Sequence, residues 1–343
     1  MQEPLQRIAQ PLLRWFGENR RPLPWRENAD PYRVWISEIM LQQTRIEAVK
    51  RYYANFTAVL PDVRSLSEIP EEQLLKLWEG LGYYSRARNL QKAAKMIMEE
   101  YGGVFPENYA QIVKLPGVGE YTAGAIASIC FNEKVTAVDG NVLRVIARLT
   151  GDRANVLLPE TKKAVTARLA AVLPEESGAF NEALMELGEL ICLPNGAPLC
   201  GECPLQPLCV ACREGLTGEL PVREKQMKRK SEEKTVLLIE DGNGRLAIEK
   251  RADPGLLSGM YQFPNVTGFL PEAELSALLH RWGFSPERIV FLKEAKHVFT
   301  HIDWLMKGYA VKVPSANDRF LWVTRAELTG RYPLPTAFKP FIK

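Results

Sequence analysis

Apolar residues in the first half of the chain recur every three or four positions, which is the period of an α-helix. One such stripe consists of Val142, Val145, Ile146 and Leu149. Glycine and proline turns such as 116–119 interrupt the stripes, and strand signals are scarce up to about residue 190. We therefore expect this part of the chain to be all-helical.

Beyond residue 234 the pattern changes to short apolar or alternating runs, which are typical of β-strands. Two runs, 235–239 and 245–248, flank Asp241-Gly242-Asn243-Gly244, a sequence that favours a tight hairpin. A helix is predicted at 271–282. Further strands are expected at 289–292, 304–313 and 320–323. These elements predict a smaller α+β domain.

Residues 222–234 lie between the two patterns and contain six lysines and arginines but almost no apolar bulk. This composition is typical of a solvated linker. We therefore expect a multidomain protein with a helical domain (1–221), a basic linker (222–234) and an α+β domain (235–343).

The composition, 343 residues with 46% hydrophobic and 25% charged, excludes disorder and a fibrous repeat. The longest uncharged apolar run, 123–131, is far shorter than the roughly 20 residues of a membrane-spanning helix. The N-terminus has no basic-then-apolar signal pattern. We expect a cytoplasmic protein without a membrane partner. The net charge of +3 permits a polyanionic partner without requiring one.

Five of the six cysteines lie between residues 192 and 212, and in a reducing compartment this crowding favours a metal site over disulfides. Seven, two and five residues separate Cys192, Cys200, Cys203 and Cys209. Four thiolates in a short loop suit tetrahedral zinc or a cubane iron-sulfur cluster. The single Cys-x-x-Cys pair fits a zinc ribbon poorly. Cys209 and Cys212 form an alternative pair.

Residues of about 110–130 predict a helix-hairpin-helix motif, because Leu115-Pro116-Gly117-Val118-Gly119 leads directly into an apolar helical run. Gly117 and Gly119 allow a tight turn, and the free N–H groups of the following helix can bind a phosphate oxygen. An ordinary turn between helices is the alternative. The whole stretch favours contact with the DNA backbone, which does not read sequence.

Glu38 lies in a predicted helix that Asp30 caps and Pro31 begins. The segment is apolar almost all round, so we expect Glu38 to be buried. Burial would raise its pKa and let it donate a proton near neutral pH, as a general acid must. The alternative is a polar stripe shared with Gln42 and Arg45.

Asp139 comes directly before the amphipathic helix that starts at Val142. A helix N-terminus stabilises a charged carboxylate, so we expect Asp139 to stay ionised while Glu38 is tuned towards protonation. Two carboxyl groups tuned in opposite directions suit cleavage of a glycosidic bond. A plain helix cap is the alternative.

Taken together, these residues resemble the helix-hairpin-helix DNA glycosylases that carry an iron-sulfur cluster, and within them the adenine-specific enzymes. The similarity covers nearly the whole chain. Its most specific segments are 35–44, 80–89, 115–124, 138–141 and the cysteine loop 192–209. The resemblance implies an all-α glycosylase domain that acts as a monomer on double-stranded DNA in base excision repair. Its substrate would be adenine mispaired with 8-oxoguanine or guanine.

The resemblance also implies roles for single residues. Glu38 would protonate adenine, and Asp139 would stabilise the sugar cation after the base has left the duplex stack. A 4Fe-4S cluster would be held by Cys192, Cys200, Cys203 and Cys209, although the family separates the first two by six residues rather than seven. Gln43, Leu81 and Tyr83 would fill the vacated helix. Trp25, Arg26 and Glu182 would line the adenine pocket.

Bifunctional relatives carry a lysine two residues after the second hairpin glycine, and its amine forms a Schiff base that leads to strand cleavage. Here that residue is Tyr121. The resemblance therefore implies base removal with little lyase activity, with Tyr121 and Asn141 assisting near the sugar.

The C-terminal region, on residues 255–264, resembles the Nudix-like domain with which adenine glycosylases recognise 8-oxoguanine. The acidic Arg-Glu-x-x-Glu-Glu box that holds magnesium in Nudix hydrolases is absent, so we expect binding rather than hydrolysis. Phe299, Thr300 and His301 lie where the family has a Phe-Ser-His loop that contacts the oxidised guanine. Without the resemblance, His301 is interpreted as an ordinary strand histidine.

Two rival hypotheses remain. A pyrimidine or thymine-mismatch glycosylase of the same superfamily would need no lesion-reading C-terminal domain. A DNA-binding protein stapled by zinc, without catalysis, would be colourless, whereas an iron-sulfur protein is brown. The missing acidic box argues against a Nudix pyrophosphatase.

Overall fold

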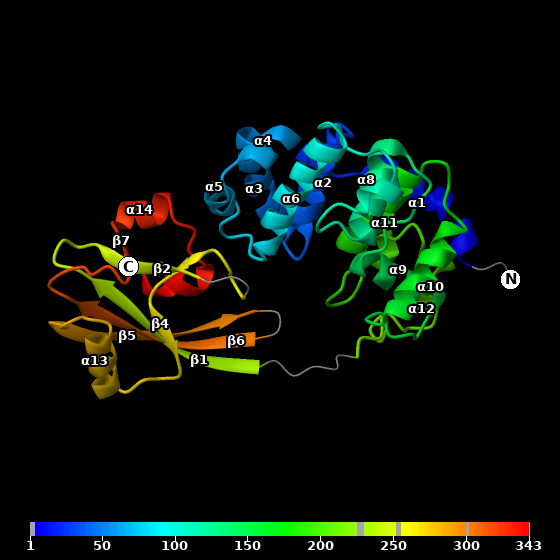
Figure 1. Cartoon of the computed structure of the whole chain (residues 1–343). Helices are drawn as coiled ribbons and strands as arrows, with labels where there is room; N and C mark the ends of the chain where they lie inside the picture. Colours follow the sequence, from blue (N-terminus) through cyan, green and yellow to red (C-terminus); the bar gives the residue numbers. More distant parts are fainter. Residues whose placement is uncertain (1–3, 225–229, 252–254, 300–301, 343) are drawn as a thin grey trace. The chain divides into compact units, whose positions relative to one another are not determined.

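The computed structural model describes residues 4–224, 230–251, 255–299 and 302–342. The chain divides into two compact units (Figure 1). The helical unit consists of residues 1–68 and 89–226, and the sheet unit of residues 69–88 and 227–343.

Every regular element described between residues 4 and 224 is a helix, which confirms the expectation from periodicity. The α-helices of the helical unit are α1 (Ala9–Asn19), α2 (Pro31–Leu41), α3 (Ile46–Val59), α4 (Val63–Glu68), α6 (Ser85–Glu100), α7 (Tyr109–Ile112), α8 (Glu120–Phe131), α9 (Gly140–Thr150), α10 (Pro159–Ala170), α11 (Ser177–Leu190) and α12 (Val210–Arg213). The first residues of α6, 85–88, belong to the sheet unit. Short 3-10 helices are η1 (Pro4–Arg7), η2 (Pro24–Arg26), η3 (Cys200–Glu202) and η4 (Gln206–Leu208).

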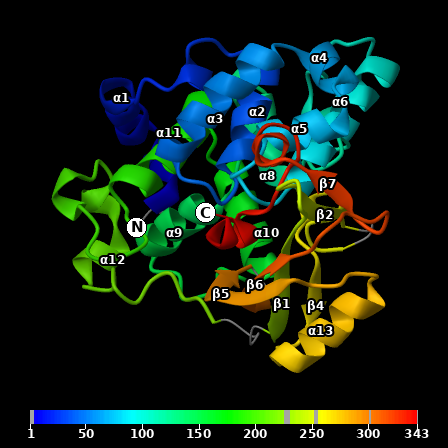
Figure 2. The ribbon, with the colours of Figure 1, turned by 90° about the vertical axis from the view of Figure 1, so that its left-hand side faces the viewer.

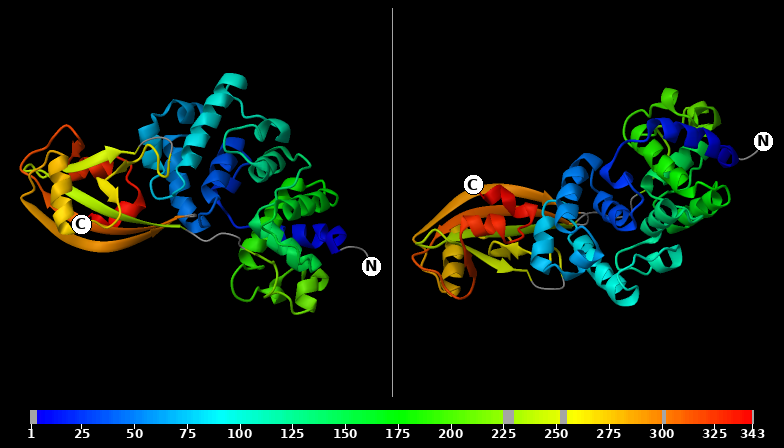
Figure 3. Two further views of the ribbon diagram at one scale, coloured as in Figure 1. Left: turned by 60° about the horizontal axis from the view of Figure 1, so that its bottom comes forward. Right: turned by 90° about the horizontal axis from the view of Figure 1, so that it is seen from above.

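Helix α9 shows how local sequence sets these elements. Asp139 caps its N-terminus by accepting from the backbone N–H of Val142, and Gly151 ends it with a left-handed φ of 71°. Its apolar face joins a core that it shares with α1 and α11. Helix α11 packs against α1, α8 and α9, and Figure 3 shows the dark-blue α1 beside these green helices.

Helix α8 is apolar almost all round and runs through the interior of the helical unit. Its Gly124 has no room for a side chain, because a Cβ there would lie 2.1 Å from the carbonyl oxygen of Thr136. No helix in the part of the chain that the structure describes is long and apolar enough to cross a membrane.

The sheet unit is built on a seven-stranded sheet with the order β3-β2-β1-β6-β5, in which β4 also pairs with β1 and β7 with β2. The strands are β1 (Lys230–Glu240), β2 (Leu246–Lys250), β3 (Tyr261–Gln262), β4 (Asn265–Thr267), β5 (Arg288–Val298), β6 (Ile302–Lys312) and β7 (Leu321–Val323). Strands β1 and β2 form the expected hairpin, with Glu240 opposite Leu246, and β1 runs parallel to β6.

Both faces of this sheet are covered, which explains the continuous apolar run in β1. Val236 and Leu238 belong to one core cluster, and Leu237 and Ile239 to the other. Helix α13 (Glu272–Arg281), predicted at 271–282, covers the second face (Figure 2). Helix α14 (Arg325–Gly330) and η5 (Thr336–Phe341) contribute to the first.

Two boundaries differ from the sequence expectation. Strand β1 begins at Lys230, so residues 230–234, which we expected in the linker, pair with β6 along their whole length. Their polar side chains give no strand pattern in the sequence. The segment becomes a strand because it pairs with β6, some 70 residues further along the chain. Residues 225–229 of the expected linker lie outside the described part of the chain.

The second difference concerns residues 69–88, which we expected in the helical domain but which belong to the sheet unit. They contain α5 (Glu71–Leu77). Arg88 pairs with Glu71 at 2.9 Å and donates to the carbonyl of Ser258. Lys339 pairs with Glu79 at 3.0 Å. These long-range polar contacts are not visible in local periodicity.

Candidate active site and cysteine pocket

A cavity of about 490 Å³ lies within the helical unit. Three separate segments bring expected site residues to its wall: Glu38 from α2, Tyr121 from α8, and Asp139 with Asn141 at the start of α9. The expected adenine-pocket residues line it as well: Trp25, Arg26 and Glu182. Residues that lie far apart in sequence, and that sequence reasoning could only pair by resemblance, therefore share one cavity.

Glu38 is buried, with only 7% of its surface exposed, as the apolar surroundings on α2 predicted. Burial raises its pKa to about 7, while a hydrogen bond with Tyr121 acts in the opposite direction. Among the described residues no group donates a hydrogen bond to its Oε2 atom. Glu38 can therefore carry a proton near neutral pH on an oxygen that no protein group occupies.

Asp139 is held by both of its oxygens. Oδ1 accepts from the N–H of Val142 at 2.8 Å, and Oδ2 accepts from Asn141 Nδ2 at 2.9 Å. Burial nevertheless raises its pKa, against these hydrogen bonds and the charge of Arg144. The expectation that the pKa values of Glu38 and Asp139 shift in opposite directions is therefore wrong. The two carboxyl groups differ in hydrogen bonding instead.

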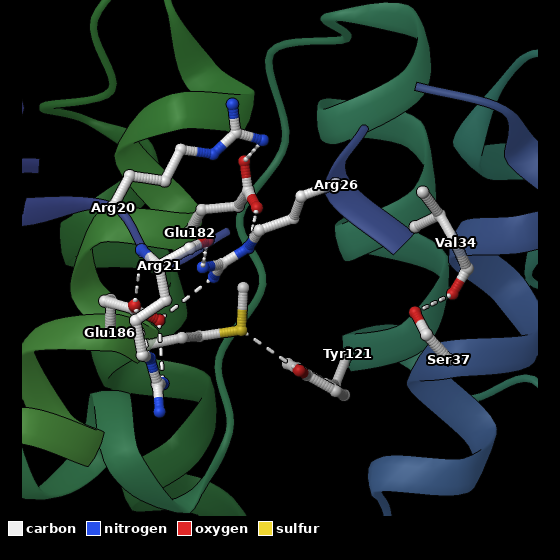
Figure 4. Close-up of polar contacts among 9 residues, drawn as sticks. Arg20, Arg21, Arg26, Val34, Ser37, Tyr121, Glu182 and Glu186 are labelled. Carbon is white, nitrogen blue, oxygen red and sulfur yellow. Dashed lines mark hydrogen bonds and ion pairs between the residues drawn. The ribbon is translucent and has the colours of Figure 1, made fainter. Parts of the chain in front are cut away.

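Tyr121 stands where bifunctional relatives have a lysine, and its hydroxyl connects two sides of the cavity. Its oxygen lies 3.0 Å from Met185 Sδ (Figure 4) and within hydrogen-bond reach of Glu38, so its single proton is donated to one of the two at a time. Burial raises the pKa of Tyr121 well above its ordinary value, so the hydroxyl keeps its proton. The site contains no amine at this position.

The opposite wall is a network of arginines and glutamates that sequence reasoning found only in part (Figure 4). Arg26 pairs with Glu182 at 2.7 Å and with Glu186 at 3.0 Å, and Arg21 pairs with Glu186 at 2.7 Å. Burial alone would raise the pKa of Glu186, but the hydrogen bonds from both arginines hold it below its ordinary value. The four-residue spacing of Glu182 and Glu186 on α11 was the signal that could have revealed Glu186.

Arg144, which sequence reasoning also missed, connects this cavity to the cysteine loop. Its Nη2 atom donates to Asn141 Oδ1 and its Nε atom to the carbonyl of Cys192, each at 2.8 Å. Because Asn141 in turn donates to Asp139, a chain of hydrogen bonds runs from the cysteine loop to the carboxylate.

The cysteine pocket is a second, much smaller cavity of about 30 Å³. Its lining includes the four cysteines expected as metal ligands and also Cys212; the five are Cys192, Cys200, Cys203, Cys209 and Cys212. All are free thiols. Arg148 donates to Cys192 Sγ at 3.4 Å. Within the described residues, no three His, Cys, Asp or Glu side chains are arranged to hold a single metal ion.

The hairpin between α7 and α8 has the conformation expected of it. Gly117 has a φ of 78°, and a Cβ there would lie 2.6 Å from Asn89 Cβ, so no larger residue fits. Gly119 is the N-cap of α8, where the unpaired N–H groups of the first turn lie.

The expected wedge residues do not line the cavity. Gln43 is exposed just after α2 with a φ of 61°. In the sheet unit, Leu81 is buried, whereas Tyr83 is 46% exposed with a φ of 47°. Phe299 packs edge-on against Trp304, with ring centroids 4.9 Å apart. Thr300 and His301 lie outside the described residues.

Comparison with known proteins finds a matching family model for each of the two parts of the chain. Residues 36–175 match the family model described as HhH-GPD superfamily base excision DNA repair protein, and residues 235–343 match a NUDIX domain. The fold is similar to the structure of a thermostable thymine-DNA glycosylase. The aligned region covers 62% of this chain and 97% of the glycosylase chain, with 29% identity and a TM-score of 0.56.

Two curated relatives extend the similarity over most of the chain. The adenine DNA glycosylase of Buchnera aphidicola subsp. Baizongia pistaciae is 33% identical over 321 residues, which cover 91% of this chain and 90% of the relative. The adenine DNA glycosylase of Mus musculus is 34% identical over 365 residues, covering 89% of this chain and 70% of the relative. The chain therefore belongs to the adenine DNA glycosylases, which are enzymes of base excision DNA repair.

Proposed function

We propose that this glycosylase removes adenine mispaired with 8-oxoguanine, and with guanine, from double-stranded DNA by hydrolysing the N-glycosidic bond. The observation that carries the proposal is that Glu38 and Asp139 line one cavity of about 490 Å³ together with a tyrosine instead of a lysine. This volume is within the usual range for a site that encloses a small ligand. The adenine must be flipped out of the duplex to enter it.

In the proposed mechanism, Glu38 is the general acid. Its pKa of about 7 keeps a large share of the carboxyl protonated near neutral pH, and its Oε2 atom accepts no hydrogen bond from the residues that the structure describes. Protonation of an adenine ring nitrogen lets the bond to C1′ break, with the bonding electron pair leaving on the base. Water then adds a hydroxyl to C1′, and its proton returns to the Glu38 carboxylate.

Asp139 stabilises the positive charge that develops on the sugar. The donors Val142 N–H and Asn141 Nδ2 fix its carboxylate before the substrate enters, so no reorganisation is needed in the transition state. Tyr121 keeps its proton and assists near the sugar. Without an amine at position 121 no Schiff base forms, so the DNA strand stays intact.

For the cysteine pocket we propose a 4Fe-4S cluster held by Cys192, Cys200, Cys203 and Cys209. The donor set fits this group, because the thiols share one small cavity and Arg148 donates to one of them. These four thiols would hold the cluster, and its bonds would join the loop after α11 to the start of α12. The Arg144 hydrogen bonds then tie that loop to Asn141.

For the C-terminal region we propose recognition of the base opposite adenine. Residues 235–343 match a Nudix model but lack the acidic magnesium box, which favours binding over hydrolysis. Phe299, Thr300 and His301 would contact the oxidised guanine, and Gln43, Leu81 and Tyr83 would contact the DNA at the vacated position. We propose that the enzyme works as a monomer at the chromosome.

Base release from matched duplexes tests this proposal. The duplexes carry adenine opposite 8-oxoguanine, guanine, cytosine or thymine, and a further one carries thymine opposite guanine; each is assayed with and without alkali. We expect alkali-dependent breaks with 8-oxoguanine and guanine opposite adenine, and the faster reaction with 8-oxoguanine. Breaks without alkali would contradict the role of Tyr121, and equal rates with all partners would overturn the proposed mispair.

A further inference from the structure

The cysteine pocket contains one thiol more than a cubane cluster requires. A 4Fe-4S cluster takes four cysteine ligands, but five cysteines line this cavity, and the fifth is Cys212. The remaining cysteine, Cys130, lies in α8 and does not line it. Cys212 is therefore not a lone cysteine, since it shares one small cavity with four other cysteine sulfurs.

Helix α12 brings Cys212 to the pocket together with Cys209. Cys209 is the N-cap of this helix and Cys212 its third residue, so the two lie three positions apart on the same face. The Cys209 thiol accepts a hydrogen bond from the N–H of Cys212. A movement of α12 would thus carry both sulfurs together.

Cys212 also has a sulfur partner on a different element. Cys200 begins η3, and its thiol is hydrogen-bonded with that of Cys212. The two sulfurs therefore lie beside each other at the wall of the same pocket.

The longest of the three chain segments between the expected ligands lies before Cys200. Seven residues separate it from Cys192, and residues 194–197 of that loop are exposed, with Gly196 at a φ of 76°. Cys203 and Cys209, in contrast, are joined through the short helix η4. The loop before Cys200 is therefore longer than the segments that join the other expected ligands, although η3 links Cys200 directly to Cys203.

We propose that Cys212 is a reserve ligand of the cluster, which binds the iron site of Cys200 when the Cys200 thiolate is lost. This inference rests on the proposed function, because it requires a cluster in the pocket. The exchange breaks one iron–thiolate bond and forms another, and the Cys212 proton passes to the Cys200 sulfur along their hydrogen bond. No oxidant or reductant is needed.

Alanine variants of the full chain test the proposal, since alanine offers no donor atom. Iron and acid-labile sulfide per chain and visible absorbance are measured for Cys200→Ala, Cys212→Ala, the double variant and Cys203→Ala. Cys130→Ala is the matched control outside the pocket, and circular dichroism reports folding. We expect both single variants at 200 and 212 to keep the cluster, and the double variant and Cys203→Ala to lose it.

The outcomes separate the two proposals. If the unchanged chain contains no iron and no acid-labile sulfide, the proposal that the pocket holds a cluster is wrong. If the unchanged chain and Cys130→Ala carry the cluster but a folded Cys200→Ala loses it as completely as Cys203→Ala, Cys212 is not a reserve ligand. Retention of the cluster in the double variant would also overturn the inference, since some other group would then supply the donor.

Discussion

The active-site cavity and the cysteine pocket are lined by the same two helices, α9 and α11, yet they differ in size and chemistry. The first has a volume of about 490 Å³ and a wall of carboxylates and arginines, whereas the second has about 30 Å³. Glu182 and Glu186 of α11 line the first cavity, and Leu187 of α11 and its C-cap residue Ile191 line the second. The residues of each pair are four positions apart and therefore lie on one face of the helix. One face lines the active-site cavity, and a neighbouring face lines the cysteine pocket.

Helix α9 also lines both cavities, but it does so with different turns along its length rather than with different faces. Its N-cap Asp139 lines the large cavity, while Val145 and Arg148, about two turns later, line the cysteine pocket. A helix start supplies free N–H groups for a carboxylate, and the later turns supply an apolar face. Arg144 lies between them and contacts both regions, so variants can separate what each region contributes.

Glu38→Gln should cause the largest effect, and only in the active-site cavity. It keeps the size of the side chain but removes the donated proton, so single-turnover adenine release should fall by about 10²- to 10⁴-fold. In the unchanged enzyme the rate should fall as the pH rises through about 7, because Glu38 loses its proton there. Binding of the mispaired duplex and iron content should not change. A normal rate in the variant would contradict the mechanism.

Asp139→Asn should follow, with a loss of about 10²- to 10³-fold in the same assay, because the developing positive charge loses its carboxylate partner. Asparagine can still cap α9, so the melting temperature serves as the control and should stay close to that of the unchanged enzyme. A large drop in melting temperature with little change in rate would show that Asp139 acts only as a cap.

Arg144→Met should be the variant that affects both regions. The buried carbonyls of Cys192 and Gly188 lose their donor, which should lower the free energy of unfolding by about 1–3 kcal/mol. Asn141 also loses its restraint, so adenine release should slow, though less than in Asp139→Asn. The matched control is Arg153→Met, an exposed arginine, in both urea unfolding and rate. Equal behaviour of the two variants would refute the connection.

Tyr121→Phe should have the smallest effect on the maximal rate. The hydrogen bond from Tyr121 lowers the pKa of Glu38, so removing the hydroxyl should raise that pKa further. The descending limb of the pH–rate profile should therefore move to higher pH. A profile that stays in place would argue that Tyr121 donates only to Met185.

Local sequence was sufficient for features whose causes lie within a few residues. The helix start at Asp139 and the hairpin between β1 and β2 follow from neighbouring side chains and turn preferences, and the structure has them as predicted. The burial of Glu38 could be predicted because the helix that carries it is apolar almost all round, and such a helix is covered by other elements.

Residue roles at a distance were decided by the tertiary structure. Arg21 and Glu186 are 165 positions apart, and no local period relates them. The onset of β1 at Lys230 depended on β6, and the position of residues 69–88 depended on contacts of Arg88 and Lys339. The pKa of Asp139 rose because burial among several elements outweighed the helix terminus.

The sequence by itself therefore determined the helices, the main strands and the kinds of chemistry: two carboxyl groups, a hairpin and a group of thiols. Only the tertiary structure decided that Glu38, Tyr121 and Asp139 share one cavity and that Cys212 lies beside Cys200. The physical reason is the distance along the chain over which each kind of interaction acts. Propensities, caps and turns act over a few residues, whereas burial, ion pairs and shared cavities arise from segments that meet only when the chain folds.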